Sequence, residues 1–352
     1  MTERDVTFGI GLVTTQNPSW DPRSQAEILG DVLRLCRDVE SMGLDAVWFS
    51  EHHFFDDSYL SSVFPLLGAV SGQTSTLRMG TAVLPAHLHD AIRLAEDAAT
   101  VDLLSDGRLL LGLGHGWRTA EFDAFGTDKV QLGARLERQI DSLRTAWSPD
   151  GALRGVAVTP KPTAATGVPI WIGGKSAAMC RRAGALSNGF ISPSASVEEI
   201  ANYAVWVAEG AAAAGRDLDD FEFGAMLPIF PWNGTELPDE VRDGISHVYW
   251  QYARMADAVF TPPPSKAPCP EDQERAAAGA AGMRTGNAEL LADIVAQSIR
   301  AVRAAIPAAK VHIVARSWWP GVPQDVLARS TSVLMNDVVP AALARCEQSL
   351  GD

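Results

Sequence analysis

The sequence predicts an α/β fold, and within that class a (β/α)8 barrel with an inserted excursion before the last barrel helix. Three observations predict it. Short apolar runs alternate with longer amphipathic segments along most of the 352 residues, eight of the short runs have the character of strands, and no sharp change of composition marks a second domain. Eight strands joined by helical crossovers form a parallel sheet that closes naturally into a barrel. We therefore expect a single barrel domain over residues 1–352.

The first part of the chain alternates strands with helices. Apolar residues at helical spacing, such as Ile28, Val32 and Val39, predict a helix after the first strand, and Gly43 is a typical residue to end it. The predicted order is strand Val6–Val13, helix Ser24–Met42, strand Asp45–Glu51, helix Ser61–Gln73, strand Leu77–Leu84, helix Asp90–Leu104, strand Arg108–Gly112, an irregular stretch, and helix Gln131–Trp147.

The second part begins with a loop over residues 149–169 and contains an irregular region. The predicted elements are strand Pro169–Ile172, helix Ser176–Leu186, strand Gly189–Ser192, helix Val197–Ala214, strand Phe221–Phe230 and strand Lys310–Ala315. Residues 231–284 look least like a barrel, since they contain TPPPSKAPCP and AAAGAAG. We interpret them as an insertion that forms a lid, with a mobile piece around residues 261–282.

Charge and cysteine content exclude several classes of protein. The formal net charge is −14 and the pI about 4.9, so the surface repels nucleic acid. Four scattered cysteines with no C-x-x-C pair argue against a disulfide framework or a thiolate metal site. The N-terminus has no signal segment, and no apolar stretch is long enough to span a membrane. We expect a cytoplasmic protein.

Candidate functional residues lie where the predicted strands end, because the chemistry of such barrels sits at the carboxyl ends of the strands. The clusters at those ends are Glu51-His52-His53, Thr81 to Pro85, Gly114 to Trp117, Gly173 to Ser176, Ser192, and Arg316 to Trp319.

The motif GGKS at 173–176 opens a helix directly after a strand. Glycines let the backbone approach a ligand closely, and the start of a helix offers free N–H groups, which together favour a phosphate. Ser176 can equally be a simple helix N-cap. The spacing does not match a P-loop, and GLGHG at 112–116 lacks the third glycine of a dinucleotide motif.

The histidines raise the possibility of a metal, but the first strand ends in Val13-Thr14-Thr15-Gln16, which offers no zinc ligand. We therefore expect no metal. His52 and His53 point in opposite directions if the strand continues through them, so one faces the barrel mouth and the other packs outward. Phe54 and Phe55 supply an apolar wall, and Asp56 and Asp57 are interpreted as a solvated loop.

The order of these clusters resembles the pattern of the bacterial luciferase-like flavin monooxygenases. The matching stretches are FSEHHF, GTAVLPAHLHDAIRLAEDAATVDLLSDGRLLLGLGHGWRTAEFDAFG, ERQIDSLRTAW and PIWIGGKSAAMCRRAGALSNGF. The resemblance covers about residues 6–225 and returns at TGNAELLADIV and in the closing ARSWWPG. Residues 229–284 match no pattern of the family.

The resemblance implies a luciferase-like barrel that binds reduced FMN and uses dioxygen. It implies that His52 is the catalytic histidine near the reactive edge of the flavin. Thr81, Ala82 and Val83 match the segment whose backbone supports the flavin ring, often with a non-proline cis peptide. The implied phosphate contacts are His115, where luciferase has an arginine, and Lys175 and Ser176. Gly173 and Gly174, which precede them in the GGKS motif, are expected to complete the cofactor-binding turn.

The implied reaction adds oxygen at the flavin C4a position to give a peroxide, which then oxygenates a small organic substrate. Such an intermediate survives only where water is excluded, and Phe54, Phe55 and Trp117 are expected to line that substrate pocket under the 231–284 lid. No second nucleotide-binding unit is evident, so we expect a separate NAD(P)H:flavin reductase. By analogy with the family, we expect a homodimer.

Two alternatives remain open from the sequence. One is a deazaflavin-dependent oxidoreductase that transfers hydride on the same barrel. The other is a flavin-binding family member without catalysis, such as the non-catalytic subunit of a heterodimer. The EHH triplet argues against the second alternative, because a scaffold does not need it.

Overall fold

Eight strands form the wall of the barrel. The computed structural model describes residues 5–256 and 282–348. The wall strands are β1 (Val6–Val13), β2 (Ala46–Phe49), β3 (Arg78–Thr81), β5 (Leu109–Gly114), β8 (Ile170–Gly173), β9 (Gly189–Ile191), β10 (Glu222–Leu227) and β13 (Lys310–Arg316).

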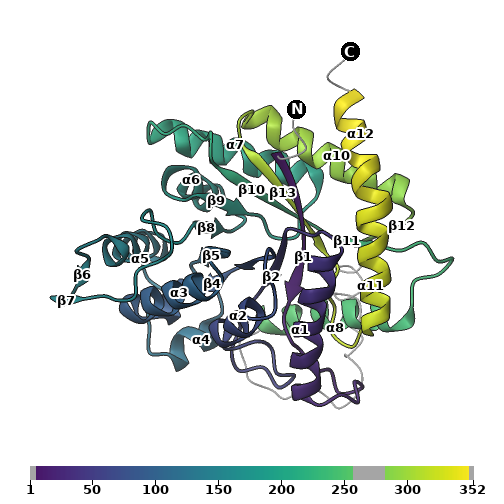
Figure 1. Ribbon diagram of the computed structural model, residues 1–352, viewed down its shortest axis with the longest axis horizontal. Coiled ribbons are helices and arrows are strands. Elements are labelled where there is room, and N and C mark those ends of the chain that lie inside the picture. The colour runs from purple at the N-terminus through teal and green to yellow at the C-terminus, as the bar shows by residue number, and fades with distance from the viewer. Residues whose placement is uncertain (1–4, 257–281, 349–352) are drawn as a thin grey trace.

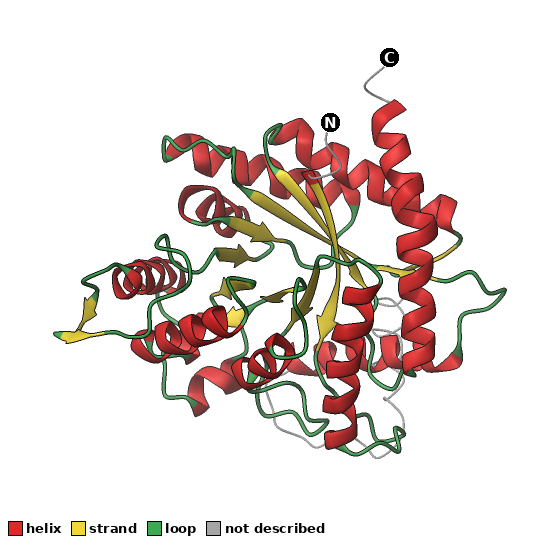
Figure 2. Ribbon diagram, viewed as in Figure 1, coloured by secondary structure: helices red, strands yellow, loops and turns green. Residues whose placement is uncertain are grey.

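These strands close on themselves. They run parallel in the order β3-β2-β1-β13-β10-β9-β8-β5, and pairing between β3 and β5 completes the ring. Figure 1 and Figure 2 show helices arranged around the strands. The predicted (β/α)8 barrel is confirmed.

The outer helices cover the wall with their apolar faces. They are α1 (Gln25–Ser41), α2 (Val63–Ser71), α3 (Ala91–Leu104), α5 (Leu132–Trp147), α6 (Ala177–Leu186), α7 (Val197–Ala213), α10 (Ala288–Ala305), and the run α11 (Gln324–Val333), η3 (Leu334–Val338) and α12 (Val339–Gln348). Their starts follow from local chemistry. Ser24 with Glu27 and Ser196 with Glu199 form capping boxes at α1 and α7, and the Asp90 side chain caps α3.

Large side chains fill the inside of the barrel. Successive residues of a strand point to opposite faces, and the inward set includes Trp48 of β2, Trp171 of β8 and Val314 of β13. The rings of Trp48 and Trp171 lie 5.0 Å apart, and Nε1 of Trp48 donates to Nε2 of His312 over 2.9 Å. Full burial lowers the pKa of His312 well below its ordinary value, so this ring is neutral. The two tryptophans therefore belong to the core.

The chain leaves the barrel after β10 and returns to it before α10. β11 (Ile229–Pro231) and β12 (Arg284–Gly286) pair in parallel and bracket the segment between them. That segment contains α8 (Asp239–Ala256). The piece expected to be mobile, around residues 261–282, lies almost entirely outside the described residues.

Several element boundaries differ from the sequence-based expectation. The predicted strand Leu77–Leu84 is divided into β3 and β4 (Leu84–Pro85), with the 3-10 turn η2 (Ala86–Leu88) after it, and the predicted strand Phe221–Phe230 is divided into β10 and β11. The stretch expected to be irregular contains α4 (Thr119–Ala124), and the loop over 149–169 contains a hairpin of β6 (Ala152–Leu153) and β7 (Val156–Ala157). These are short elements with too few residues to give a periodic signal.

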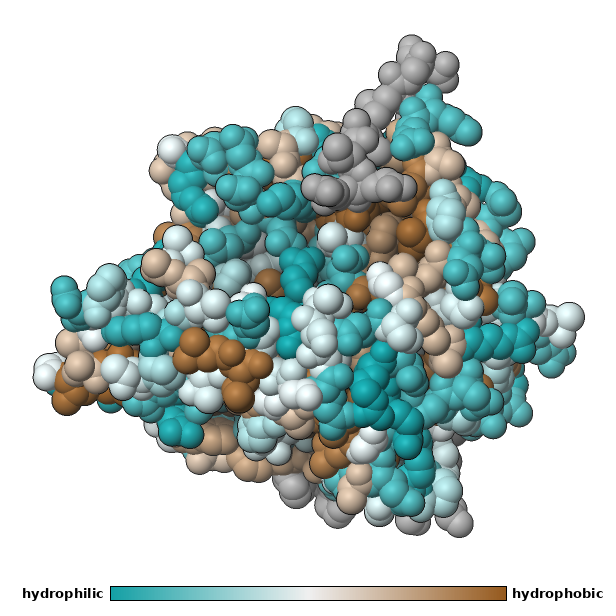
Figure 3. Space-filling view, in the orientation of Figure 1, coloured by the Kyte–Doolittle hydropathy of each residue, from teal (hydrophilic) through white to brown (hydrophobic). Residues whose placement is uncertain are grey.

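The face of the molecule seen in Figure 3 is mainly hydrophilic, and its hydrophobic patches are small and separate. In residues 5–256 and 282–348, no helix is both long enough and apolar enough to cross a lipid bilayer.

Candidate active site

His52 is held at the mouth of the barrel by a carboxylate from another element. It follows the end of β2, and its Nδ1 lies 2.9 Å from Oε1 of Glu121 on α4. Both side chains are buried, and Glu121 is completely so. The same Oε1 accepts the backbone N–H of His53 over 3.0 Å, and Arg118 lies 3.8 Å away. Sequence reasoning missed Glu121, because α4 is too short to be predicted.

The carboxylate of Glu121 determines which nitrogen of His52 carries the proton. Burial alone would raise the pKa of Glu121, but the hydrogen bonds from His52 and His53, together with the charge of Arg118, lower it below its ordinary value. An ionised carboxylate can only accept, so Nδ1 of His52 donates to it. Nε2 of His52 has no hydrogen-bond partner among the described residues, and in the neutral ring it is the nitrogen with a free lone pair.

The second carboxylate of the EHH triplet binds the other histidines. Oε1 of Glu51 lies 3.1 Å from Nε2 of His53 and 2.8 Å from Nε2 of His89. Burial would raise the pKa of Glu51, but these two hydrogen bonds lower it. The rings of His52 and His53 therefore have different carboxylate partners, as expected for side chains that point in different directions. Among the described residues, no group of three or more His, Cys, Asp or Glu residues is arranged to hold a metal ion.

Aromatic rings surround His52. The ring of Tyr59 lies 5.1 Å from it, that of Trp117 5.9 Å and that of Phe55 6.0 Å. Phe54, in contrast, has a positive φ of 61° and is 42% exposed, and its ring packs 5.8 Å from the exposed Phe125. Trp117 is also 42% exposed. Phe55, Tyr59 and Trp117 thus adjoin His52, while Phe54 faces away from it. Sequence reasoning did not single out Tyr59.

The segment Thr81–Val83 lies beside the end of β2 and fills a space left by glycines. The backbone N–H of Ala82 donates to Phe49 over 2.7 Å, and the Ala82–Val83 peptide is cis. A Cβ at Gly114 or at Gly173 would come within 2.5 Å of the Val83 side chain. The structure therefore brings Thr81–Val83, Gly114 and Gly173 together, and His115 and Gly174 follow those two glycines directly.

His115 is half-buried in the loop after β5. Its Nδ1 lies 2.6 Å from the carbonyl oxygen of Gly116, the residue that follows it. Nδ1 therefore donates to that carbonyl, which leaves Nε2 for another partner.

The start of α6 is built from the GGKS motif. Ser176 is the N-cap, and its hydroxyl accepts a hydrogen bond from the Met179 N–H over 3.3 Å. The N-cap interpretation of Ser176 is thus confirmed, although its side chain remains exposed. Lys175 is exposed too, and it forms no hydrogen bond or ion pair with any described residue. A Cβ at Gly174 would lie 2.9 Å from Met179, so the backbone here packs closely on α6.

Asp57 is buried, which corrects the expectation of a solvated loop. Its carboxylate accepts hydrogen bonds from Nε2 atoms of Gln16 at 2.6 Å, His247 at 2.8 Å and Gln251 at 2.9 Å. His247 and Gln251 belong to α8, so Asp57 fastens the inserted helix to the loop after β2. Asp56 is exposed, as expected. The burial of Asp57 comes from contacts about 190 residues away, which the local sequence does not reveal.

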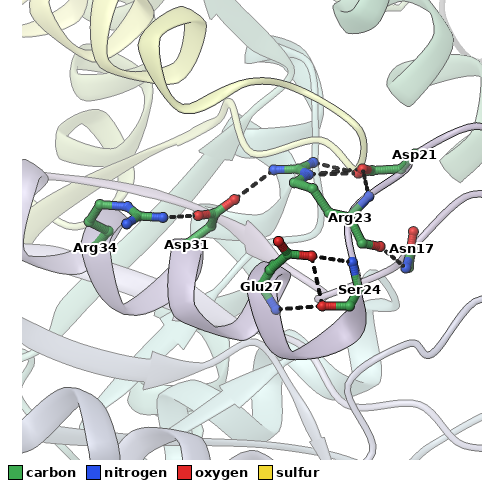
Figure 4. Close-up of polar contacts among 7 residues, drawn as sticks. All are labelled: Asn17, Asp21, Arg23, Ser24, Glu27, Asp31 and Arg34. Carbon is green, nitrogen blue, oxygen red and sulfur yellow. Dashed lines mark hydrogen bonds and ion pairs between the residues drawn. The ribbon is translucent and has the colours of Figure 1, made fainter.

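A separate surface cleft of about 440 Å³ lies between the start of α1, α8 and the loop after β13. Figure 4 shows three of the charged residues that line it, Asp21, Arg23 and Asp31. Arg23 binds Asp21 over 2.9 Å and Asp31 over 2.8 Å, and Arg34 binds Asp31 in turn. Burial would raise the pKa of Asp21, but the bonds from Arg23 lower it. Arg23 is thus held by two carboxylates, and the other charged residues that line this cleft, Glu240 and Asp243, are exposed.

Comparison with known protein families identifies the family of this chain. The model of the family described as luciferase-like monooxygenase matches residues 7–310. The chain belongs to the luciferase-like monooxygenase family. The resemblance inferred from the motifs is therefore confirmed.

Individual relatives of this luciferase-like chain include two kinds of enzyme. It is 27% identical over 161 residues to the oxygenase component of flavin-dependent trigonelline monooxygenase from Acinetobacter baylyi, covering 43% of this chain and 45% of that protein. It is 27% identical over 219 residues to F420-dependent glucose-6-phosphate dehydrogenase from Amycolatopsis mediterranei, covering 57% and 65%. The chain thus aligns with only about a third to two thirds of the length of such curated relatives.

The crystal structure of monooxygenase RslO1 from Streptomyces bottropensis has the same fold. It superposes with a TM-score of 0.69 at 21% identity, over 95% of this chain and 99% of that one.

Proposed function

We propose that this protein is a flavin-dependent monooxygenase that uses reduced FMN and dioxygen to oxygenate a small organic substrate. The observation that carries the proposal is His52 with a fixed Nδ1–H and a free Nε2. It follows the end of β2 in a luciferase-like barrel, and the glycine-lined turn Thr81–Val83 is bonded to that same strand end. The trigonelline monooxygenase relative is named as flavin-dependent, which supports the choice of cofactor.

The residues present fit a flavin with a phosphate tail. The exposed start of α6, with Gly173, Gly174, Lys175 and Ser176, offers N–H groups and a cation that suit a phosphate. His115 would add a donor from the neighbouring loop. Thr81, Ala82 and Val83 would support the ring system beside the end of β2. When bound, reduced FMN supplies the electrons that activate dioxygen.

His52 is the residue we assign to proton transfer. Glu121 fixes the orientation of the imidazole, so Nε2 can accept a proton from a reacting oxygen or return it. Phe55, Tyr59 and Trp117 would keep water away from that nitrogen. The insertion 231–284 would act as the lid, since α8 is already fastened to the mouth through Asp57.

Reduced flavin would come from a separate NAD(P)H:flavin reductase, because the trigonelline relative is named as an oxygenase component. We further propose a homodimer, by analogy with the family.

Deazaflavin-dependent hydride transfer is the second candidate. The relative named F420-dependent glucose-6-phosphate dehydrogenase favours it, at the same 27% identity as the flavin-dependent relative. Both reactions need a histidine near the ring, so His52 does not distinguish them.

An anaerobic binding titration followed by mixing with oxygen distinguishes these candidates. We expect reduced FMN to bind more tightly than reduced F420, and the bound FMN to react with oxygen at a rate different from that of free reduced FMN. Tight binding of F420 together with no binding of reduced FMN would reject the proposal in favour of hydride transfer.

A further inference from the structure

Arg316 is a buried cation at the carboxyl end of β13. His312 and Val314 of the same strand point into the barrel, and alternation along the strand directs Arg316 to the same side. Its position at the last residue of the strand places the side chain at the mouth. Only 7% of the residue is exposed.

Aromatic rings enclose the guanidinium group. Its Cζ lies 4.9 Å from the ring centre of Trp319, 5.5 Å from that of Tyr249 and 5.6 Å from that of Tyr252. Two of these rings belong to the inserted helix α8. The face of an aromatic ring attracts a cation but does not replace a hydrogen-bond acceptor for the N–H groups in the guanidinium plane. The N–H groups of Arg316 are therefore available to bind an acceptor.

No described residue accepts a hydrogen bond from Arg316 or forms an ion pair with it. Other partly buried arginines do have such partners. Arg108 donates to the Leu77 and Thr74 carbonyl oxygens over 2.8 and 2.9 Å, and Arg78 binds the Glu222 carboxylate over 2.8 Å. The Arg316 nitrogens keep slight contact with solvent, since none of them is among the fully buried polar atoms that lack a partner. A guanidinium that has lost most of its water without gaining a protein acceptor is costly. Such a group calls for an anionic partner.

Arg316 lies close to the candidate reaction site. The hydroxyl of Tyr252 is 3.2 Å from that of Tyr59, and the Tyr59 ring is 5.1 Å from His52. Burial raises the pKa of the Tyr59 hydroxyl, and the positive charge of Arg316 partly opposes that rise. Tyr59 and Tyr252 thus connect Arg316 to His52 through a continuous series of side-chain contacts.

We propose that Arg316 binds an anionic group of the substrate, and that the substrate is a small apolar molecule bearing a carboxylate. A planar carboxylate matches the fork of a guanidinium and can accept two of its hydrogen bonds at once. The aromatic side chains between Arg316 and His52 suit the apolar remainder. This inference rests on the proposed function, because it takes the mouth of the barrel as the reaction site. The flavin itself could supply an anion, so the test separates the two sources.

The test measures binding of two matched pairs of probes to the full chain, with and without FMN: benzoate against benzamide, and butyrate against butyramide. We expect at least one carboxylate to bind wild type tenfold or more tightly than its neutral amide, and Arg316→Gln to abolish that preference. Arg329→Gln is the matched control, since Arg329 also lies over an aromatic ring, 4.4 Å from Trp232, but is exposed on α11. It should keep the preference.

Two outcomes overturn the proposal. The first is the absence of a carboxylate preference that depends on Arg316: wild type binds neither carboxylate more tightly than its amide, or Arg316→Gln keeps the preference of wild type. The other is that Arg316→Gln weakens FMN binding tenfold or more without changing carboxylate binding, which would assign the cation to the flavin. If Arg316→Gln does not fold, Arg316→Lys decides the matter: it should lose tenfold or more in carboxylate affinity, and unchanged affinity rejects the proposal. FMN binding to wild type is measured in a separate titration. If wild type does not bind FMN, the proposed cofactor is rejected, but the measurements without FMN still show whether Arg316 binds a carboxylate.

Discussion

Glu121 accepts a hydrogen bond from His52 over 2.9 Å, although the two residues lie 69 positions apart in the chain. The bond joins the loop after β2 to the short helix after β5. It fixes the tautomer of His52 and leaves Nε2 for the reaction. We infer that Glu121 is a positioning residue for His52.

Glu121→Gln should slow the reaction of bound reduced FMN with oxygen by about 100-fold, because the amide can donate as well as accept and no longer fixes the His52 proton on Nδ1. Stopped-flow absorbance measures the rate, and nitrogen NMR of the His52 ring should report a mixture of tautomers. FMN affinity should not change.

Glu51→Gln is the control for that experiment, since Glu51 binds His53 and His89 instead of His52. Its oxygen reaction should stay close to that of wild type. Equal slowing in both variants would mean that Glu121 acts only by holding the structure together.

Asp57→Ala should destabilise the protein by about 3–5 kcal/mol, because it leaves buried donors of Gln16, His247 and Gln251 without their acceptor. The free energy of unfolding is measured by urea denaturation. Asp56→Ala removes the same type of side chain from the exposed neighbouring position and should change stability by less than about 0.5 kcal/mol. Similar losses in both variants would contradict the role of Asp57 as the fastening point of α8.

Gly114→Ala should destabilise the protein by about 1–3 kcal/mol, because its Cβ would lie 2.5 Å from Cγ2 of Val83. Val83→Ala removes the clashing methyl groups, so the double variant should recover most of the loss. Urea denaturation of both single variants and the double variant gives the coupling energy. Simple addition of the two effects would show that Val83 does not occupy the space at Gly114.

His87 should make the protein less stable in mild acid. Burial, with a contribution from Arg135, lowers the pKa of His87 from 6.5 to about 4. Between these two pH values the unfolded chain binds a proton that the folded protein does not, so stability falls as the pH decreases from 6.5 to 4. His87→Gln should reduce this loss by about 1 kcal/mol, since the ring is only partly buried. Denaturation midpoints at pH 7 and pH 5 measure it, and identical pH dependence in both proteins would contradict the prediction.

The barrel could be predicted from the sequence because its strands and long helices carry a clear periodic signal. Val6–Val13 agrees with the structure residue for residue. The six helices predicted between Ser24 and Ala214 differ from the observed ones by at most two residues at each end. The sequence predicts no bounds for α4, α8, α10, α11 or α12. The placement of His52 and of Gly173–Ser176 at strand ends also follows from the chain order alone.

The partners of those residues could not be predicted in the same way. Glu121 lies on a helix of six residues, and Asp57 is buried by a helix about 190 positions away. Tyr59 and Arg316 both contact Tyr252 of α8, which is distant from each of them in the chain. Contacts between distant segments decide burial and pairing, and they leave no mark on local composition.

The most direct test of the account is the oxygen reaction of bound reduced FMN in wild type and in His52→Ala. Both proteins should bind reduced FMN with affinities within about threefold of each other. The rate of reaction with oxygen should be at least about 100-fold lower in the variant. If reduced FMN does not bind to wild type, or if the two proteins react with oxygen identically, His52 is not the proton-transfer residue of a flavin-dependent monooxygenase.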